Sequence, residues 1–214
     1  MRSRTYWQSA HGEPTVTVLL RHGQTPMSVQ KRYAGRSDVP LTDVGVQQAA
    51  AAAKRLASAR LGAIVTSPLL RAVQTAQEVA AVSGAVVVTD DGFRETDFGA
   101  WEGLTFTEVR ERWPAELAAW LADPEVAPPG GESFTDVSAR VTAALRRVLA
   151  DRQGQLVLIV SHVTPIKTLV AAAQLAPSAA LFRMHLDVAA LCEIDWYADG
   201  PAVLRSFNDT AHLS

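Results

Sequence analysis

The sequence predicts an α/β fold in which helices cover both faces of a mostly parallel central sheet. Short apolar runs rich in β-branched residues recur along the chain, and the first is Thr15-Val16-Thr17-Val18-Leu19-Leu20. Helical stretches separate these runs, as they do when crossover helices join parallel strands. Of the 214 residues, 48% are hydrophobic, which is enough to fill the core of one large domain. We therefore expect a three-layer α/β/α sandwich.

In the first half of the chain, strands and helices alternate as in a series of βαβ units. The expected elements are a strand over 15–20, a helix over 42–59, a strand over 63–67, a helix over 69–82 and a strand over 85–88. Thr42 and Asp43 suit a helix N-terminus, and Pro68 suits a first helical turn. This half therefore supplies three of the expected strands.

The second half of the chain begins with an irregular segment. Residues 93–129 contain scattered aromatic residues and four prolines, so we expect short helices that form an insertion or lid. Trp113 and Trp120 are seven residues apart, a helical spacing that favours a packed face over an aromatic substrate wall. The elements expected after this segment are a helix over 133–151, a strand over 155–160, a helix containing Pro165, and an edge hairpin of 188–196 and 202–207.

The charge balance gives no general attraction to nucleic acid or to an anionic membrane. Lys and Arg total 20, Asp and Glu total 22, and the formal net charge is −2. No stretch has the continuous apolar character of a secretory signal or a membrane span, so we expect a cytoplasmic protein. The single Cys192 rules out an internal disulfide and is expected in the core. Residues 1–14 are expected to form a flexible arm ahead of one domain over 15–214.

Arginines and histidines follow three of the expected strands at their carboxyl ends. Arg21-His22 follows the first strand, Arg71 lies just past the second, and Ser161-His162 follows the strand over 155–160. Because the carboxyl ends of strands in a doubly wound sheet share one edge, we expect these side chains on one rim. Arginine offers a rigid fork of donors for phosphate, and histidine is a nucleophile near neutral pH. Taken alone, each residue also suits an ordinary structural role; together they predict a local anion site.

Five blocks of sequence resemble the histidine phosphatase superfamily, whose fold is phosphoglycerate mutase-like. They are Leu20-Arg21-His22-Gly23-Gln24-Thr25, the block over 66–76 around Arg71, the block over 93–103, Gly130-Gly131-Glu132-Ser133, and Val160-Ser161-His162. The resemblance runs in order from residue 16 to about residue 207. The pattern over 94–103 is closer to the phosphatase branch, including alpha-ribazole phosphatases, than to the mutases.

A narrower resemblance links residues 95–98 and 161–167 to the acid phosphatase half of bifunctional ribonuclease H/acid phosphatase chains. A domain needs at least ~50 residues, and only about fifteen precede the first strand. We therefore expect the phosphatase half without a ribonuclease H half.

The resemblance implies a phosphatase that acts through a phosphohistidine. His22 is the implied nucleophile, and it attacks phosphorus as the neutral imidazole. Arg21, Arg71 and His162 are implied to bind the non-bridging oxygens and to neutralise charge in the transferring phosphoryl group. No metal and no cofactor are then required.

Two carboxylates compete for the role of general acid. The family pattern favours Glu95, which would protonate the leaving oxygen and then, as a carboxylate, take a proton from water. Asp97 is the rival, two residues further on. The structural alternative for either is an exposed loop residue or a partner of Arg94.

Substrate contacts are expected from four further residues. An asparagine six residues after the histidine commonly binds phosphate in the family, and here that position is Ser28, which donates one hydrogen bond. The loop over 32–38 resembles the family's substrate rim, so Gly35 and Arg36 are expected there, although a solvated Arg36 is as good an interpretation. Backbone donation is expected near Thr164. The implied partner is a small-molecule phosphate ester.

Two other functions remain open at this stage. A phosphoglycerate mutase would use the same phosphohistidine but return the phosphoryl group to its substrate, and the sequence around Glu95 argues against it. A non-catalytic phosphoryl-binding domain would bind without turnover, and the departures from the family pattern at Ser28 and Val163 suggest it. A two-metal nuclease is not favoured, because no strand-end motif supplies clustered carboxylates.

Overall fold

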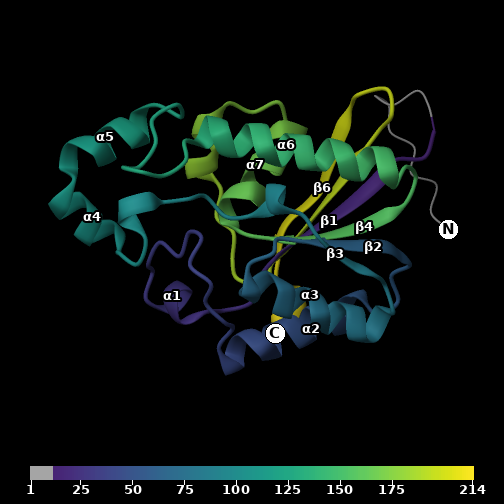
Figure 1. Cartoon of the computed structure of the whole chain (residues 1–214). Coiled ribbons are helices and arrows are strands. Elements are labelled where there is room, and N and C mark those ends of the chain that lie inside the picture. The colour runs from purple at the N-terminus through teal and green to yellow at the C-terminus, as the bar shows by residue number, and fades with distance from the viewer. Residues whose placement is uncertain (1–11) are drawn as a thin grey trace.

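The computed structural model describes residues 12–214, which form a central sheet between two layers of helices (Figure 1). Helices α2 (Asp43–Leu56) and α3 (Leu70–Ser83) cover one face, and helices α6 (Phe134–Asp151) and α7 (Val163–Ala173) cover the other. The expected three-layer sandwich is confirmed. The expected arm over 1–14 lies outside the described residues except for its last three.

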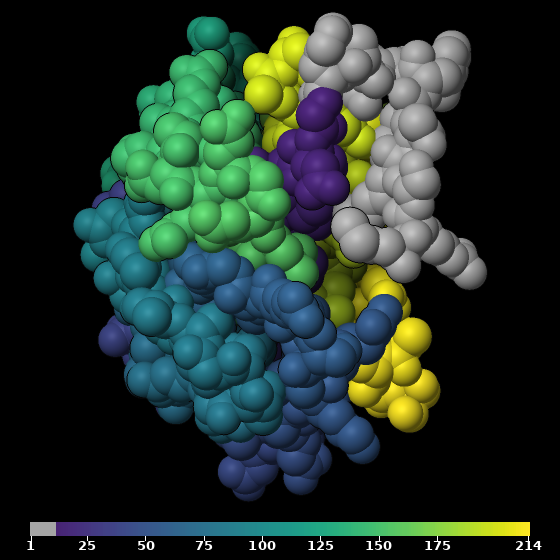
Figure 2. All heavy atoms as spheres, turned by 90° about the vertical axis from the view of Figure 1, so that its right-hand side faces the viewer, coloured from purple at the N-terminus to yellow at the C-terminus, as the bar shows by residue number. Residues whose placement is uncertain are grey.

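Within the described residues, six strands form one sheet in the order β3-β2-β4-β1-β5-β6. The strands are β1 (Thr15–Arg21), β2 (Leu61–Thr66), β3 (Val87–Thr89), β4 (Leu156–Ser161), β5 (Leu191–Trp196) and β6 (Ala202–Asp209). The first four in this order are parallel, and β5 pairs antiparallel with both β1 and β6. In Figure 2 the purple residues where β1 begins lie between green residues of α6 and yellow residues from the end of the chain. The sheet is thus mostly parallel, with the expected hairpin at one edge.

Strand β4 lies inside the sheet and is buried on both faces. Val157 and Ile159 pack toward α6 and α7, whereas Leu158 and Val160 pack toward α2 and α3. Each such side chain contributes about 1.5–3 kcal/mol when it is fully buried. A strand covered on both faces has no polar alternation, which explains the continuous apolar sequence of β4.

Local signals set most of the helix ends. The Thr42 hydroxyl caps α2 by accepting the Gly45 N–H, and Ser133 forms a capping box with Asp136 at the start of α6. Helix α3 ends at Gly84, whose φ of +68° is left-handed. Helix α2 ends at Leu56, three residues before the expected end, because the chain turns there into β2. Among residues 12–214, no helix is long and apolar enough to cross a membrane.

The segment over 93–129 folds into short helices around its own apolar cluster. It contains α4 (Phe106–Arg112), α5 (Pro114–Ala122) and a 3₁₀ turn at Gly99–Trp101. Trp101 and Trp120 are buried and meet edge to face, with ring centroids 5.5 Å apart, and Trp113 packs against the same cluster. Both tryptophans are packed as expected, but Trp113 lies at the junction of α4 and α5 and not on one helix face with Trp120.

Candidate active site

Two histidines and two arginines meet at the carboxyl ends of β1, β2 and β4. His22 follows β1, His162 follows β4, and Arg71 lies in the first turn of α3, just past β2. The rings of His22 and His162 have centroids 5.1 Å apart, and His22, His162 and Arg71 are all buried. Arg21 is held in place because its Nη1 donates to the Leu186 carbonyl at 2.7 Å. The structure therefore brings together four side chains that the sequence had placed on one rim.

The hydrogen bond of His22 determines which of its nitrogens can react. Nδ1 lies 2.7 Å from the Gly23 carbonyl oxygen. Because a carbonyl only accepts, Nδ1 carries the proton and Nε2 keeps its lone pair. Burial, followed by the charges of Arg71 and Arg21, holds the pKa of His22 well below its usual range. His22 is therefore neutral at neutral pH, as a nucleophile must be.

Gly23 fixes the backbone just after His22. A Cβ at Gly23 would collide with the carbonyl oxygen of Gly45 in α2, so only glycine fits. The Gly23 N–H donates to the Thr75 hydroxyl at 3.2 Å, and that hydroxyl donates to the Arg71 carbonyl at 2.8 Å. Helices α2 and α3 together thus hold the backbone next to His22 in place.

Several buried side-chain nitrogens of the site have no hydrogen-bond partner among the described residues. They are Nε of Arg21, Nε of Arg71 and Nδ1 of His162. The other ring nitrogen of His162 lies 2.7 Å from the Ser67 hydroxyl, and Arg71 donates through Nη1 and Nη2 to the carbonyls of Ser37 and Gly35, both at 2.8 Å. Burial lowers the pKa of Arg21 to about 10, so it remains a cation at neutral pH. The unpaired Nε atoms of the two guanidinium groups are buried, positively charged donors, and such donors suit an anionic ligand.

The two buried histidines predict a loss of stability in mild acid. Burial is the main reason that the pKa of each lies well below 6.5 in the folded state. Below pH 6.5 the two histidines bind protons in the unfolded chain but stay neutral in the folded chain. Their contribution to the free energy of unfolding is therefore complete above pH 6.5 and decreases as the pH falls below it. We expect the free energy of unfolding in urea to fall by up to about 1.4 kcal/mol per pH unit for each histidine between pH 6.5 and 5.5. His22→Asn should remove one histidine's share of this slope; an unchanged slope would show that His22 titrates normally.

Glu95 lies in the same site, and the first turn of α7 holds its carboxylate. Glu95 is 7% exposed. Its Oε1 accepts the N–H of Thr96 at 2.8 Å and that of Thr164 at 3.3 Å, and its Oε2 accepts the N–H of Val163 at 3.1 Å. Burial is the larger effect on the pKa of Arg21 and lowers it, whereas the negative charge of Glu95 raises it. The backbone N–H of Thr164 thus contacts the carboxylate of Glu95.

Asp97, the rival carboxylate, faces a different set of partners. Its Oδ1 accepts the Gly99 N–H at 2.9 Å, and its Oδ2 lies 3.4 Å from Nε of Arg36. Arg36 also pairs with Glu132 at 3.2 Å, while 43% of its side chain stays exposed. Arg36 is therefore a rim residue already engaged by two carboxylates, and Arg94 pairs with Asp91 rather than with either candidate acid.

Ser28 lies in the short helix α1 (Pro26–Val29), where its hydroxyl is used locally. It accepts the Thr25 N–H at 2.9 Å and donates to the Thr25 carbonyl at 2.8 Å, completing a capping box. Phosphate contact by Ser28 would require the hydroxyl to leave these bonds.

Sequence reasoning assigned no role to Lys167, Glu132 or Arg140, which surround the site. Lys167 lies one turn along α7 from Val163 and donates to the Leu181 carbonyl at 3.2 Å, and burial lowers its pKa. Glu132 lies in the block Gly130-Gly131-Glu132-Ser133, so the family resemblance is the signal that points to it. Arg140 looks like any arginine on the polar face of a long helix.

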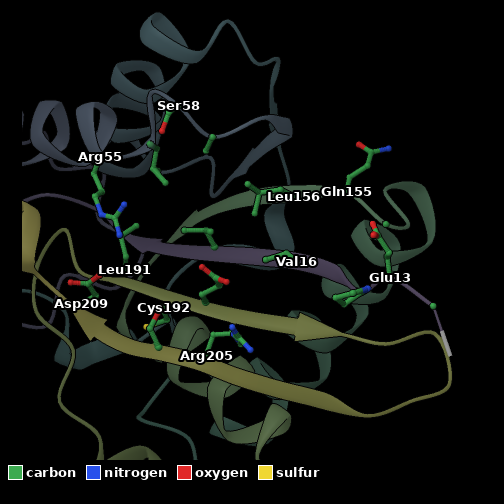
Figure 3. A pocket seen from close by; sticks show the side chains of 18 residues that line it. Glu13, Val16, Arg55, Ser58, Gln155, Leu156, Leu191, Cys192, Arg205 and Asp209 are labelled. Carbon is green, nitrogen blue, oxygen red and sulfur yellow. The ribbon is translucent and has the colours of Figure 1, made fainter. Parts of the chain in front are cut away.

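Within the described part of the chain, no group of three or more His, Cys, Asp or Glu side chains is arranged to hold a metal ion. A cavity of about 1020 Å³ lies elsewhere, between the end of α2 and strands β1, β5 and β6 (Figure 3). Arg55, Leu191 and Arg205 are among its lining residues, and none of the residues of the site lines it. The site is therefore the cationic cluster at the strand ends, not this cavity.

Fold and site together define an α/β domain with a cluster of two histidines and two arginines at the carboxyl edge of its sheet. The chain belongs to the histidine phosphatase superfamily: the family model for branch 1 matches residues 17–210. The family expected from the sequence blocks is confirmed.

Two curated relatives illustrate the range of the family. The bifunctional protein Rv2228c of Mycobacterium tuberculosis is 49% identical over 208 residues, a match that covers 97% of this chain and 57% of that protein. The chain thus spans little more than half the length of that relative. A probable phosphoglycerate mutase, GpmB of Yersinia pestis, is 34% identical over 203 residues, covering 91% of this chain and 93% of that protein.

The similar solved structures include phosphatases. Mycobacterial glucosyl-3-phosphoglycerate phosphatase Rv2419c, solved with VO3, has a TM-score of 0.84 at 33% identity and covers 92% of this chain and 100% of that chain. A putative alpha-ribazole-5'-P phosphatase from Escherichia coli has a TM-score of 0.83 at 28% identity and covers 92% and 97%.

Proposed function

We propose that this protein hydrolyses phosphate monoesters of small metabolites through a phosphohistidine formed on His22. The observation that carries the proposal is the pocket itself, in which a neutral imidazole with a free Nε2 is buried beside Arg21 and Arg71. The imidazole supplies the nucleophile, and the guanidinium groups supply the positive charge, so the reaction needs neither metal nor cofactor.

The reaction divides into two displacements at phosphorus. In the first, Nε2 of His22 bonds to phosphorus, the ester P–O bond breaks, and Glu95 gives its proton to the leaving oxygen, which departs as an alcohol. In the second, the Glu95 carboxylate takes a proton from water, the water oxygen bonds to phosphorus, and the P–N bond breaks. Inorganic phosphate leaves, and His22 and Glu95 return to their starting forms. Arg21, Arg71 and His162 hold the non-bridging oxygens throughout.

The substrate is expected to be an alpha-ribazole phosphate-like ester or one of a broad range of small esters. The similar structures support small substrates, since their titles name a glucosyl-3-phosphoglycerate phosphatase and a putative alpha-ribazole-5'-P phosphatase. The net charge of −2 gives no reason to expect a nucleic acid partner. The single Cys192 is free and buried, which suits a reducing compartment such as the cytoplasm.

Release of inorganic phosphate from a panel of esters tests the proposal. We expect the wild type to release phosphate from alpha-ribazole phosphate, sugar phosphates or 4-nitrophenyl phosphate, and to keep this activity in an excess of chelator. Assay with a phosphate-sensitive dye gives the readout. Absence of release from every ester, or loss of activity on chelation, would show that the proposed function is wrong.

A mutase is the second candidate, because the similarity to the probable phosphoglycerate mutase extends over 91% of the chain. The same panel separates the two functions if it includes 3-phosphoglycerate. A mutase transfers the phosphoryl group to another hydroxyl of the substrate, whereas a phosphatase releases it to water. Isomerisation that is faster than phosphate release would favour the mutase.

A further inference from the structure

The segment that carries Glu95 continues from a single 3₁₀ turn at Asp91–Phe93, and side chains hold the backbone of both. Four consecutive carbonyl oxygens, from Gly92 to Glu95, each accept a side-chain hydrogen bond. Arg140 of α6 donates to three of them, at 3.0 Å for Gly92, 2.7 Å for Arg94 and 2.9 Å for Glu95. Ser161 of β4 donates to the fourth at 2.7 Å. The position of the Glu95 backbone therefore depends largely on one guanidinium group.

Arg140 also binds Glu132, which holds the other side of the segment. Its Nε and Nη2 donate to the two carboxylate oxygens of Glu132 at 2.9 and 3.0 Å, so all five N–H groups of Arg140 are in use. Glu132 in turn accepts the backbone N–H of Asp97 at 3.0 Å. The pair thus fixes the chain both before and after the Glu95 side chain.

Two glycines allow this segment to lie so close to its supports. A Cβ at Gly92 would collide with the side chain of Ala144 on α6, one turn from Arg140. A Cβ at Gly131 would collide with the carbonyl oxygen of Asp97. These close contacts prevent the segment from shifting toward α6. Its position there is set by the hydrogen bonds that Arg140 and Glu132 make to its backbone.

We propose that Arg140 and Glu132 are positioning residues that place Glu95 for proton transfer to the leaving oxygen, an inference that rests on the proposed role of Glu95 as general acid. Neither residue is hydrogen-bonded to His22, Arg21 or Arg71, which are held by Gly23, Leu186 and the loop at Gly35 and Ser37. Loss of the pair should therefore impair proton donation and leave the phosphate pocket in place.

Esters whose leaving groups differ in basicity distinguish a loss of proton donation from damage to the phosphate pocket. An alkoxide is a strong base that needs a proton as the P–O bond breaks, whereas 4-nitrophenolate leaves well without one. The value of kcat/KM covers the steps up to departure of the alcohol, so it does not include hydrolysis of the phosphohistidine. A general acid is worth about 10²–10⁴-fold where the proton is needed.

The experiment compares Arg140→Met with the wild type on glycerol 2-phosphate and on 4-nitrophenyl phosphate. We expect kcat/KM to fall about 100-fold on the alkyl ester and less than about fivefold on the aryl ester. Inhibition by inorganic phosphate should stay within about twofold of wild type. The matched control is Arg147→Met, on the same helix, because Arg147 pairs with Asp90 at 2.9 Å just ahead of the segment and does not reach Glu95. This control should keep the wild-type ratio between the two esters.

An equal loss on both esters, or no loss on either, would overturn the proposal. If Arg140→Met does not fold, judged by circular dichroism, then Glu132→Gln and Arg140→Lys test the same ratio with less disturbance. Glu132→Gln should show a selective loss, and Arg140→Lys should recover part of the wild-type activity on the alkyl ester. If the wild type releases no phosphate from either ester, the proposed function fails rather than the positioning role.

Discussion

The His22→Ala variant is expected to lose hydrolysis of phosphate monoesters, with kcat/KM falling on the order of 10⁵-fold or more. In the proposed reaction Nε2 of His22 bonds to phosphorus, and within the described residues no other side chain of the pocket offers a free nucleophilic nitrogen in the same position. His162 has an unpaired Nδ1, but its ring lies 5.1 Å away from that of His22 and is fully buried. Removing the nucleophile therefore removes the covalent route altogether.

Radiolabelling measures this loss directly. The wild type, incubated briefly with a ³²P-labelled ester and quenched in alkali, should carry an acid-labile label, as a phosphoramidate does. His22→Ala should carry none. The control is His185→Ala, because 80% of the His185 side chain is exposed and, among the described residues, it pairs with Asp187. Labelling of His22→Ala at the wild-type level would place the phosphoryl group on another residue.

The Arg71→Met variant is expected to show the second-largest loss, a fall in kcat/KM of about 10³-fold. Arg71 is buried, and its Nε lacks a partner among the described residues, so this donor is available to a phosphoryl oxygen. In a pocket closed to water, a fixed positive charge stabilises the transferring group more strongly than it would in solvent. Inhibition by inorganic phosphate should weaken together with catalysis.

Arg71 also supports a loop, and a second variant separates the two roles. Its guanidinium donates to the carbonyls of Gly35 and Ser37, while Asp38 of the same loop accepts the Leu70 N–H at 2.6 Å. Asp38→Ala loosens the loop but keeps the cation, so it should lower kcat/KM by no more than about tenfold. If both variants lost activity equally and both kept their affinity for phosphate, Arg71 would be acting only through the loop.

The residues at the strand ends could be predicted because a strand that is buried on both faces of the sheet is a continuous apolar run in the sequence. Continuous apolar runs end at Arg21-His22 and at Ser161-His162, and the polar residues that follow parallel strands gather on one edge of the sheet. The strand β5 was predicted to start at 188 and starts at Leu191. The reason is Ala189, whose φ of +54° interrupts the extended chain beside His22.

The supports of Glu95 could not be predicted, because their partners are far away in sequence and follow no period. Arg140 binds carbonyls 45 to 48 residues away, and in the sequence it looks the same as Arg146 or Arg147 on the same helix. The sequence leaves open whether Arg36 contacts a substrate or solvent, because its pairing with Asp97 and Glu132 arises only when the segments fold together. The sequence does contain a signal for the capping role of Ser28, because Thr25 lies three residues before it, the spacing of a capping box.

The order of the strands also determines when the site can form during synthesis. Strand β1 lies between β4 and β5, so both of its neighbours come from the last third of the chain. During synthesis both edges of the apolar strand β1 stay unpaired for on the order of ten seconds, until β4 and β5 have left the ribosome. Its nascent form is thus open to aggregation or to capture by chaperones until β4 is made, and His22, the proposed nucleophile, is among the first of the site residues to be synthesised.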